Sequence, residues 1–255
     1  MKEIEAGRVV GPFKAPPFPK FRTSPIGIVP KKVPNEFRLI HHLSYVKGSS
    51  VNDSIPDECS SVHYATISDA IHILKKLGAG CFLAKTDIKS AFHIIPAHPL
   101  EYPLLDIKWA NEYYFDRCLA MGLKPSCAIF EKFSSSLEWL AMQHLHVSAV
   151  LHILDDILFI APSRVKCSED LHMFLDLCNF LGVPIAQDKT VGPDTTLQFA
   201  GIELDSVWQE ARLPLDKLTK CRTLLHHFHK KRSVTLRELQ SLIGLLNHRQ
   251  PKLSL

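Results

Sequence analysis

Residues 150–160, VLHILDDILFI, place two adjacent acids between two strongly apolar runs. In one continuous strand, neighbouring side chains point to opposite faces, so one acid would enter the core. A tight turn at Asp155-Asp156 avoids this and brings both carboxylates to one end of a hairpin. Such carboxylates repel each other and are costly to desolvate, and a divalent cation offsets both penalties. A plain surface turn explains the pair equally well, because Asp is common in turns.

Asp87 is the second acidic feature. It ends the apolar run 81–86, which has the pattern of a buried strand, and residues 88–92, IKSAF, follow it. If the two strand ends are neighbours, three carboxylates converge at one edge of a sheet. Oxygen clusters of this kind suit magnesium or manganese. A pair of such ions roughly 4 Å apart can activate an attacking oxygen and stabilise a leaving one. For Asp87 alone, a turn at the end of a strand is the alternative.

The rest of the chain predicts an α+β domain with helices on one face of an antiparallel sheet. Four prolines between residues 12 and 19 favour an extended lead-in. Thr66 and Asp69 cap a helix at 67–77, and Thr235 and Glu238 form a capping box for the last helix. Further helices are predicted at 125–144, from Ser163 to about 181, and before the last helix. The predicted strands are 26–29, 37–40, 81–88, 104–109, 113–118, 150–154, 157–161 and 197–204, with a turn at 33–36.

Composition narrows the class of protein. Hydrophobic residues make up 46% and charged residues 22% of the 255 residues, which indicates a folded chain. The net charge of +4 permits a nucleic-acid partner without requiring one. The seven cysteines form no C-x-x-C pair, so a reducing, intracellular setting in the cytoplasm or nucleus is expected. No signal peptide or membrane helix is recognisable, so no membrane partner is expected.

The order of motifs resembles that of reverse transcriptases, most closely those of retrotransposons. No single motif is decisive, but six in the right order argue against coincidence. The resemblance runs from about residue 11 to 205 and rests on the basic hairpin 24–32 with 37–40, the first palm motif 86–96, the template-and-nucleotide motif 121–130, the double-aspartate motif 154–156, the lysine motif 182–189 and the primer-grip hairpin 199–202. Residues 38–44 and 51–53 resemble the branch that carries a tyrosine recombinase, the DIRS type.

This resemblance implies a right-hand polymerase with fingers, a palm and a partial helical thumb. The palm would be a ferredoxin-like antiparallel sheet with helices on one face. Residues 1–22 would form the extended lead-in and 23–80 the fingers. Residues 81–205 would form the palm with a fingers insertion, and 206–255 the partial thumb or connection helices. Ribonuclease H and recombinase domains would belong to the parent element.

The resemblance also implies an activity: extension of a primer 3′-hydroxyl with deoxynucleotides on an RNA or DNA template. Asp87 and Asp155 would bind two Mg²⁺ or Mn²⁺ ions, and Asp156 would complete the cluster. The backbone carbonyl of Ile88 would be a further metal ligand. Lys189 would protonate the departing pyrophosphate.

The remaining implied roles concern the nucleotide and the primer. Arg38, with Lys31 or Lys32, would contact the triphosphate, and Phe92 would lie under the sugar and exclude a 2′-hydroxyl. On the residues alone, a solvated basic edge and a core phenylalanine explain these positions as well. Met121 and Gly122 would lie at the nucleotide, and Leu154, Phe199, Ala200 and Gly201 would contact the primer.

Three positions depart from the family pattern, and they bear on fidelity, processivity and activity. Ile153 stands where an aromatic residue is common, Met121 where glutamine is common, and His42 where many relatives have aspartate. Only about two helices follow residue 205. A catalytically inactive or co-opted nucleic-acid-binding fragment is therefore the alternative to a polymerase. A metal-dependent nuclease could use the same acids, but it would need neither fingers nor a primer grip.

Overall fold

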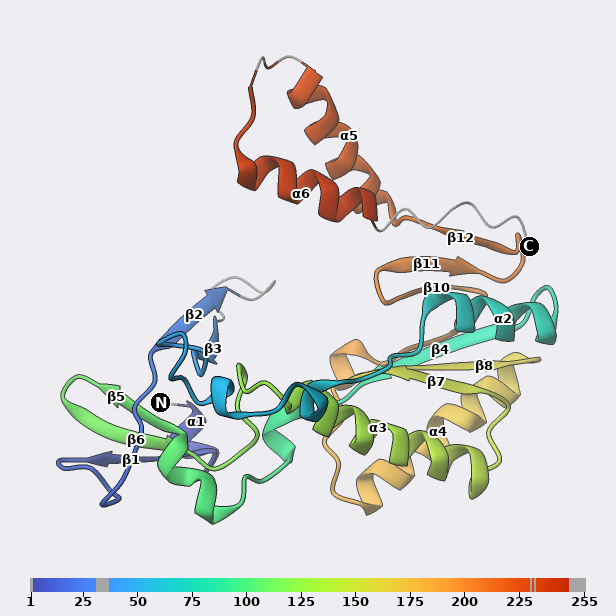
Figure 1. Cartoon of the computed structure of the whole chain (residues 1–255). Coiled ribbons are helices and arrows are strands. Elements are labelled where there is room, and N and C mark those ends of the chain that lie inside the picture. The colour runs from blue at the N-terminus through green and yellow to red at the C-terminus, as the bar shows by residue number, and fades with distance from the viewer. Residues whose placement is uncertain (1, 31–36, 230, 232, 248–255) are drawn as a thin grey trace. The chain divides into compact units, whose positions relative to one another are not determined.

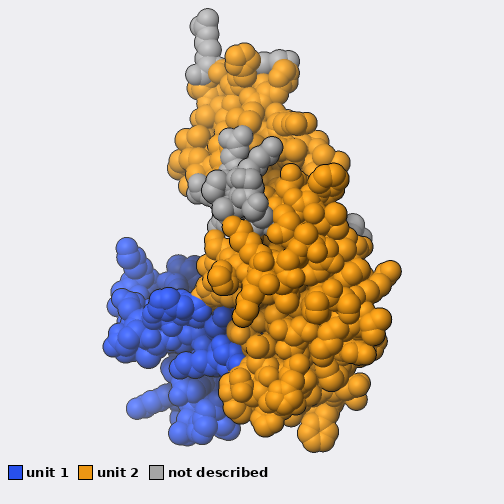
Figure 2. Space-filling view, turned by 90° about the vertical axis from the view of Figure 1, so that its right-hand side faces the viewer, with its two compact units in different colours: residues 1–63, 89–135 blue, residues 64–88, 136–255 orange. Residues whose placement is uncertain are grey.

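The computed structural model describes residues 2–30, 37–229, 231 and 233–247 of the chain (Figure 1). It divides into two compact units, coloured separately in Figure 2. Unit 1 comprises Met1–His63 and Lys89–Ser135, and unit 2 comprises Tyr64–Ile88 and Ser136–Leu255. The turn predicted at 33–36, together with Lys31 and Lys32, lies outside the described residues.

Unit 1 contains two small antiparallel sheets. One sheet has the order β1-β6-β5, and the other pairs β2 with β3. The two-residue turn between β5 and β6 is Ala110-Asn111, as predicted, and both residues have positive φ values of 49° and 62°. The elements of unit 1 are α1 (Lys2–Glu5), β1 (Val9–Phe13), β2 (Ile26–Pro30), β3 (Phe37–His41), β5 (Asp106–Trp109) and β6 (Glu112–Asp116), with single-turn helices at Asn52–Ser54, Asp57–Ser60, Ala91–Ile94 and Pro99–Leu104.

The N-terminal lead-in is more structured than predicted. Its β1 pairs antiparallel with β6, from Val9 opposite Asp116 to Phe13 opposite Tyr113. Gly11 allows this close approach, because a Cβ atom at that position would lie 2.7 Å from the Tyr113 carbonyl oxygen. The prolines favour an extended chain, as expected, and the extended chain joins a sheet.

The central sheet of unit 2 has the order β7-β8-β4-β9, with every neighbouring pair antiparallel. Leu83, Leu158 and Ile160 share one face and pack in a cluster with α2 and with the β10–β11 hairpin. On the opposite face, Phe159 packs against Phe174 of α4 with ring centroids 5.2 Å apart. The elements are β4 (Phe82–Asp87), β7 (Val150–Ile153), β8 (Asp156–Ala161), β9 (Val191–Asp194), α2 (Ile67–Leu77) and α4 (Arg164–Phe180), and α3 (Ser126–Gln143) runs from unit 1 into unit 2.

Helix α2 has the bounds and the caps that the sequence predicts. The Thr66 side chain accepts from the Asp69 backbone N–H, and the Asp69 carboxylate accepts from the Thr66 backbone N–H at 2.7 Å. Gly78 ends the helix with a positive φ of 89°. The apolar spacing buries Ile67, Ala70, Ile71 and Leu74. Local signals therefore determine this helix from end to end.

The predicted single strand 197–204 is wrong, because the chain reverses in its middle. β10 (Thr196–Phe199) and β11 (Ile202–Asp205) form a hairpin around Ala200 and Gly201, whose φ values are 45° and 81°. β12 (Glu210–Arg212), which was not predicted, extends this sheet. The helices α5 (Leu215–His229) and α6 (Leu236–Asn247) follow as predicted.

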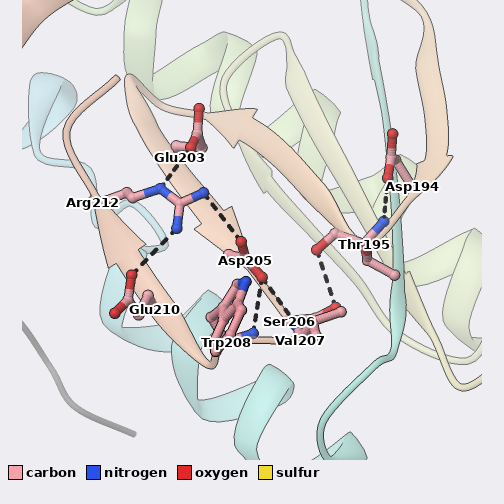
Figure 3. Close-up of polar contacts among 9 residues, drawn as sticks. All are labelled: Asp194, Thr195, Glu203, Asp205, Ser206, Val207, Trp208, Glu210 and Arg212. Carbon is pink, nitrogen blue, oxygen red and sulfur yellow. Dashed lines mark hydrogen bonds and ion pairs between the residues drawn. The ribbon is translucent and has the colours of Figure 1, made fainter. Parts of the chain in front are cut away.

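Arg212 ties β12 to β11 (Figure 3). Its guanidinium donates to Glu203 at 2.7 Å and to Asp205 at 3.1 Å, and a third bond reaches Glu210 at 3.2 Å. Asp205 also accepts from the backbone N–H groups of Val207 and Trp208. These donors outweigh the effect of burial and lower the pKa of Asp205. We refer to Arg212 and its three carboxylates as the Arg212 cluster.

Candidate functional site

Strand pairing brings the predicted carboxylates together at one end of the central sheet of unit 2. Asp87 lies directly opposite Asp156 in the β4–β8 pair, so both side chains project from the same face. The backbone of Asp155 is held at the same place, because the Ile88 N–H donates to the Asp155 carbonyl at 3.0 Å. Asp87 is 5% exposed, whereas Asp155 and Asp156 are half-buried.

The turn between β7 and β8 lies one residue earlier than predicted. Ile153 pairs with Asp156, so the turn residues are Leu154 and Asp155, and Leu154 has a positive φ of 54°. This register is favoured because it places Leu158 and Ile160 in the apolar cluster on the same face as Asp156. Asp156 is therefore the first residue of a strand, and only Asp155 belongs to the turn.

The electrostatics show that the three acids interact. Burial raises the pKa of Asp156, and the negative charges of Asp155 and Asp87 raise it further. The positive charges of Lys85 and Lys189 act in the opposite direction on Asp156, and the Lys189 ammonium lies 2.7 Å from Asp87 Oδ2. Although burial of Lys189 acts in the other direction, its hydrogen bond to Asp87 raises the pKa of the lysine. The resemblance predicted Lys189 at this site, and the structure places it on Asp87.

The donor set suits a hard divalent cation, since it consists of carboxylate oxygens that repel one another. Yet among the described residues no three His, Cys, Asp or Glu side chains are grouped closely enough to hold a metal ion. In this arrangement the Lys189 ammonium supplies positive charge at Asp87. The Lys189 side chain is 56% exposed, so it has room to rotate away.

The primer-side residues lie in two turns of unit 2. Leu154 is in the β7–β8 turn, and Ala200 and Gly201 form the β10–β11 turn next to Phe199. Sequence reasoning missed the two lysines that hold the second turn. Lys85 donates to the Gln198 carbonyl at 2.7 Å, and Lys217 donates to the Gly201 carbonyl at 2.9 Å. A lysine inside the apolar run 81–86 was the available signal for Lys85.

A part-buried histidine–carboxylate contact close in sequence to the acidic turn was also missed. His152 on β7 contacts the Glu138 carboxylate of α3 through its Nδ1 atom. His152 is buried and lies two residues before Leu154. The pair therefore attaches the end of β7 to α3. A histidine in a buried strand pattern signals such a partner, but the sequence alone does not identify it.

The predicted nucleotide-side residues that the structure describes belong to unit 1. Arg38 is exposed on β3, and Phe92 packs edge-to-face on Phe130 with ring centroids 5.5 Å apart. The Met121 carbonyl accepts from the His41 N–H at 2.9 Å. Gly122 has a φ of 116°, and a Cβ atom there would lie 2.0 Å from the His41 carbonyl oxygen. Only glycine fits this position.

Asn52 supports the loop that contains Gly122, and its role was not predicted. Its side-chain amide donates to the Gly122 carbonyl and accepts from the Lys124 N–H, both at 2.8 Å. One side chain thus satisfies two backbone groups of this loop. In the sequence, Asn52 stood out only as part of residues 51–53, which resemble one retrotransposon branch.

The antiparallel sheet with acids at adjacent strand ends, flanked by helices, is consistent with the palm of a fingers-and-palm polymerase. The family model described as "Reverse transcriptase (RNA-dependent DNA polymerase)" matches residues 29–204. The chain belongs to this family, whose members are nucleotidyltransferases. In the described ranges, no helix has the length and apolar character needed to span a bilayer.

Relatives in sequence are viral polyproteins. Over 186 residues the chain is 22% identical to the genome polyprotein of Petunia vein clearing virus, covering 71% of this chain and 8% of the polyprotein. Over 179 residues it is 26% identical to the Gag-Pro-Pol polyprotein of Mouse mammary tumor virus, covering 66% of this chain and 9% of that protein. The chain thus spans less than a tenth of these relatives. It is a reverse transcriptase domain of the kind found in retroelement and viral polyproteins.

Solved structures confirm the predicted fold class. The foamy viral protease-reverse transcriptase dRH, in complex with double-stranded DNA, matches with a TM-score of 0.70 and 18% identity, covering 96% of this chain and 38% of that chain. The foamy viral protease-reverse transcriptase in complex with an RNA/DNA hybrid matches with a TM-score of 0.69 and 18% identity, covering 96% of this chain and 29% of that chain. At this identity the likeness concerns the fold.

Proposed function

We propose that the chain is the polymerising core of a retroelement reverse transcriptase, which extends a primer 3′-hydroxyl with deoxynucleotides on an RNA or DNA template. The observation that carries this proposal is the pairing of Asp87 with Asp156 beside the Asp155 turn, in a chain of the reverse transcriptase family. The complexes of foamy viral relatives with double-stranded DNA and with an RNA/DNA hybrid support a template–primer partner.

In this proposal Asp87, Asp155 and Asp156 hold two Mg²⁺ or Mn²⁺ ions, with the Ile88 carbonyl as a further ligand. The bound ions would lower the pKa of the 3′-hydroxyl and neutralise the triphosphate. Lys189, whose side chain is 56% exposed, would have to release Asp87 for that carboxylate to hold a cation. The Lys189 ammonium is a proton donor and would protonate the departing pyrophosphate.

The nucleotide would be bound by residues of unit 1. Arg38, with Lys31 or Lys32, pairs with phosphate oxygens through its guanidinium fork. Phe92 lies under the sugar, and its ring is held in place by Phe130. Phe92→Ala is therefore expected to raise ribonucleotide incorporation, and an unchanged preference for deoxynucleotides would argue against this role. Gly122, next to Met121, lets the backbone approach the nucleotide.

The proposed organisation follows from these roles. Residues 23–80 serve as fingers, 81–205 as palm with a fingers insertion, and 206–255 as partial thumb, after the lead-in 1–22. Leu154 and the turn Phe199-Ala200-Gly201 contact the primer. The parent element would be of the DIRS type and would supply ribonuclease H and recombinase domains. All seven cysteines are free thiols, which fits work in the reducing cytoplasm or nucleus.

Primer extension with the purified chain, a labelled RNA- or DNA-templated primer, deoxynucleotides and Mg²⁺ tests the proposal. Asp155→Asn is expected to abolish synthesis and to weaken Mn²⁺ binding measured by calorimetry, with an unchanged circular dichroism spectrum. Asp176→Asn is the matched control, because Asp176 is exposed on α4. If Asp155→Asn synthesises as much DNA as the wild type, the site assignment is refuted. Nucleic-acid binding by the wild type without any extension would favour the inactive, co-opted fragment instead.

A further inference from the structure

The β10–β11 hairpin is held at two backbone carbonyls by lysines from other parts of unit 2. Lys85 of β4 donates to Gln198 O at 2.7 Å, near the end of β10. Lys217 of α5 donates to Gly201 O at 2.9 Å, in the turn itself. The acceptors are main-chain atoms, so both contacts fix the backbone of the hairpin rather than one of its side chains.

Lys85 occupies an unusual position for a charged residue. Its strand, β4, lies in the interior of the sheet, with Leu158 of β8 opposite Lys85 on one side and Val191 of β9 on the other. Strand alternation puts Lys85 on the same face as Asp87, two residues further on. Desolvating an ammonium is costly unless it finds a hydrogen-bond partner. The partner here is a neutral carbonyl on β10, the outer strand of its sheet.

The packing around this contact limits the freedom of β10. Leu197 and Phe199, on either side of Gln198, are buried in one cluster with Leu83 and Leu158. β10 therefore presents apolar side chains to the central sheet and a carbonyl to Lys85. The contact ties β10 to the strand that ends at Asp87.

Lys217 holds the turn that follows β10. Gly201 has a φ of 81°, and a Cβ atom at this position would lie 2.2 Å from Lys217 Nζ. The lysine is thus packed directly against the turn, where a side chain larger than hydrogen would displace it. Through this contact α5 is attached to the turn that follows β10.

We propose that Lys85 and Lys217 are positioning residues that hold the turn Ala200-Gly201 at a fixed distance from Asp87 and so align the primer 3′ end. The proposal rests on the proposed function, in which this turn contacts the primer. Neither lysine touches the reacting atoms. Their effect is on geometry, and small displacements of a reacting group lower the rate strongly.

The test combines single-nucleotide extension with hydrogen–deuterium exchange of the nucleic-acid-free protein. Lys85→Met is expected to lower kcat by about 10-fold or more while the KM for the deoxynucleotide stays within about 2-fold. Exchange should become faster in residues 196–205. Lys85→Arg retains a cationic donor and should recover most of the rate.

Lys217→Met should give the same pattern, with faster exchange centred on the turn. Lys75→Met, at an exposed lysine in the last turn of α2, is the matched control and should behave as the wild type.

Wild-type kcat and wild-type exchange in Lys85→Met and Lys217→Met would overturn the proposal. So would a lower kcat with unchanged exchange in 196–205, because the loss would then not come from the hairpin. If Lys85→Met does not fold, Lys217→Met, which removes the donor at the turn, carries the test with the same expected outcomes. If the wild type itself extends no primer, the proposed function fails. In that case, faster hydrogen–deuterium exchange in the variants still supports the conclusion that the two lysines hold the hairpin. Unchanged exchange refutes that conclusion.

Discussion

Replacing Asp106 with asparagine removes a buried carboxyl group from the start of β5. Asp106 is 0% exposed, and neither carboxyl oxygen has a hydrogen-bond partner among the described residues. Burial raises the pKa of Asp106 from 3.8 to about 6. The nearby His41 ring, which lies 3.0 Å from Asp116, acts in the opposite direction without reversing the shift.

The sign of the pH effect follows from this shift. Because the folded-state pKa lies above the unfolded value, the stabilising contribution of Asp106 is fully present below pH 3.8 and is lost as the pH rises through about 6. A difference of about 2 pKa units corresponds to about 3 kcal/mol of unfolding free energy. Asparagine cannot ionise, so Asp106→Asn should not suffer this loss. It should exceed the wild type by up to about 3 kcal/mol near neutral pH and match it in acid.

Urea unfolding between about pH 4 and pH 7.5, followed by circular dichroism and tryptophan fluorescence, measures this difference. Glu112→Gln is a useful control of opposite sign, because its hydrogen bond from Lys14 lowers the pKa of Glu112 on the neighbouring strand. Relative to the wild type, Glu112→Gln should be slightly less stable near neutral pH and equally stable in acid. If the wild type and Asp106→Asn change in parallel over the whole range, the buried carboxyl does not titrate with a raised pKa and the reasoning is refuted.

Three further substitutions have expected outcomes in thermal or urea unfolding. Lys189→Met leaves Asp87 without its counter-charge, so the metal-free protein should lose about 1 kcal/mol, and Mg²⁺ should restore most of it; a more stable metal-free variant would contradict the electrostatic picture. Thr66→Ala removes the α2 capping box and should cost about 1 kcal/mol, whereas an unchanged midpoint would show that the cap is dispensable. Gly122→Ala should cost more than about 2 kcal/mol, because its Cβ would meet the His41 carbonyl; a neutral result would mean that the loop rearranges freely.

Helices with strong local signals could be predicted almost to the residue. Helix α2 has its cap at Thr66, its stop at Gly78 and an apolar stripe between them, so no tertiary contact is needed to place it. The same holds for the capping box of α6, where the Thr235 N–H donates to the Glu238 carboxylate at 2.8 Å. Tight turns such as Ala110-Asn111 were equally visible.

Strands whose existence depends on a distant partner could not be predicted. β9 and β12 read VGPD and EAR, and neither short segment has an apolar alternation of its own. β9 forms because β4 offers it a free edge, and β12 because Arg212 reaches Glu203 and Asp205 on β11. The apolar residues on both sides of Ala200-Gly201 made residues 197–204 look like one strand, although the family resemblance implied a hairpin at 199–202.

The candidate site was partly visible in the sequence. The convergence of Asp87 with Asp156 followed from two apolar runs that each meet an acid, and the register confirms that these two strand ends meet. The one-residue error in the turn arose because acids in adjacent positions cannot be assigned to turn or strand without the partner strand. The contacts of Lys85 and Lys217 join segments more than 100 and about 15 residues apart along the chain, and no sequence spacing signals them. The catalytic and binding roles remain predictions.

The Arg212 cluster has an electrostatic consequence for nucleic acid. It combines three carboxylates with one guanidinium, which leaves two net negative charges on the β11–β12 edge. The lowered pKa of Asp205 keeps that carboxyl ionised at neutral pH. Phosphate groups are repelled by such an edge, and the repulsion weakens as salt screens it. If the domain binds a template–primer duplex as proposed, we expect the duplex to avoid the β11–β12 edge.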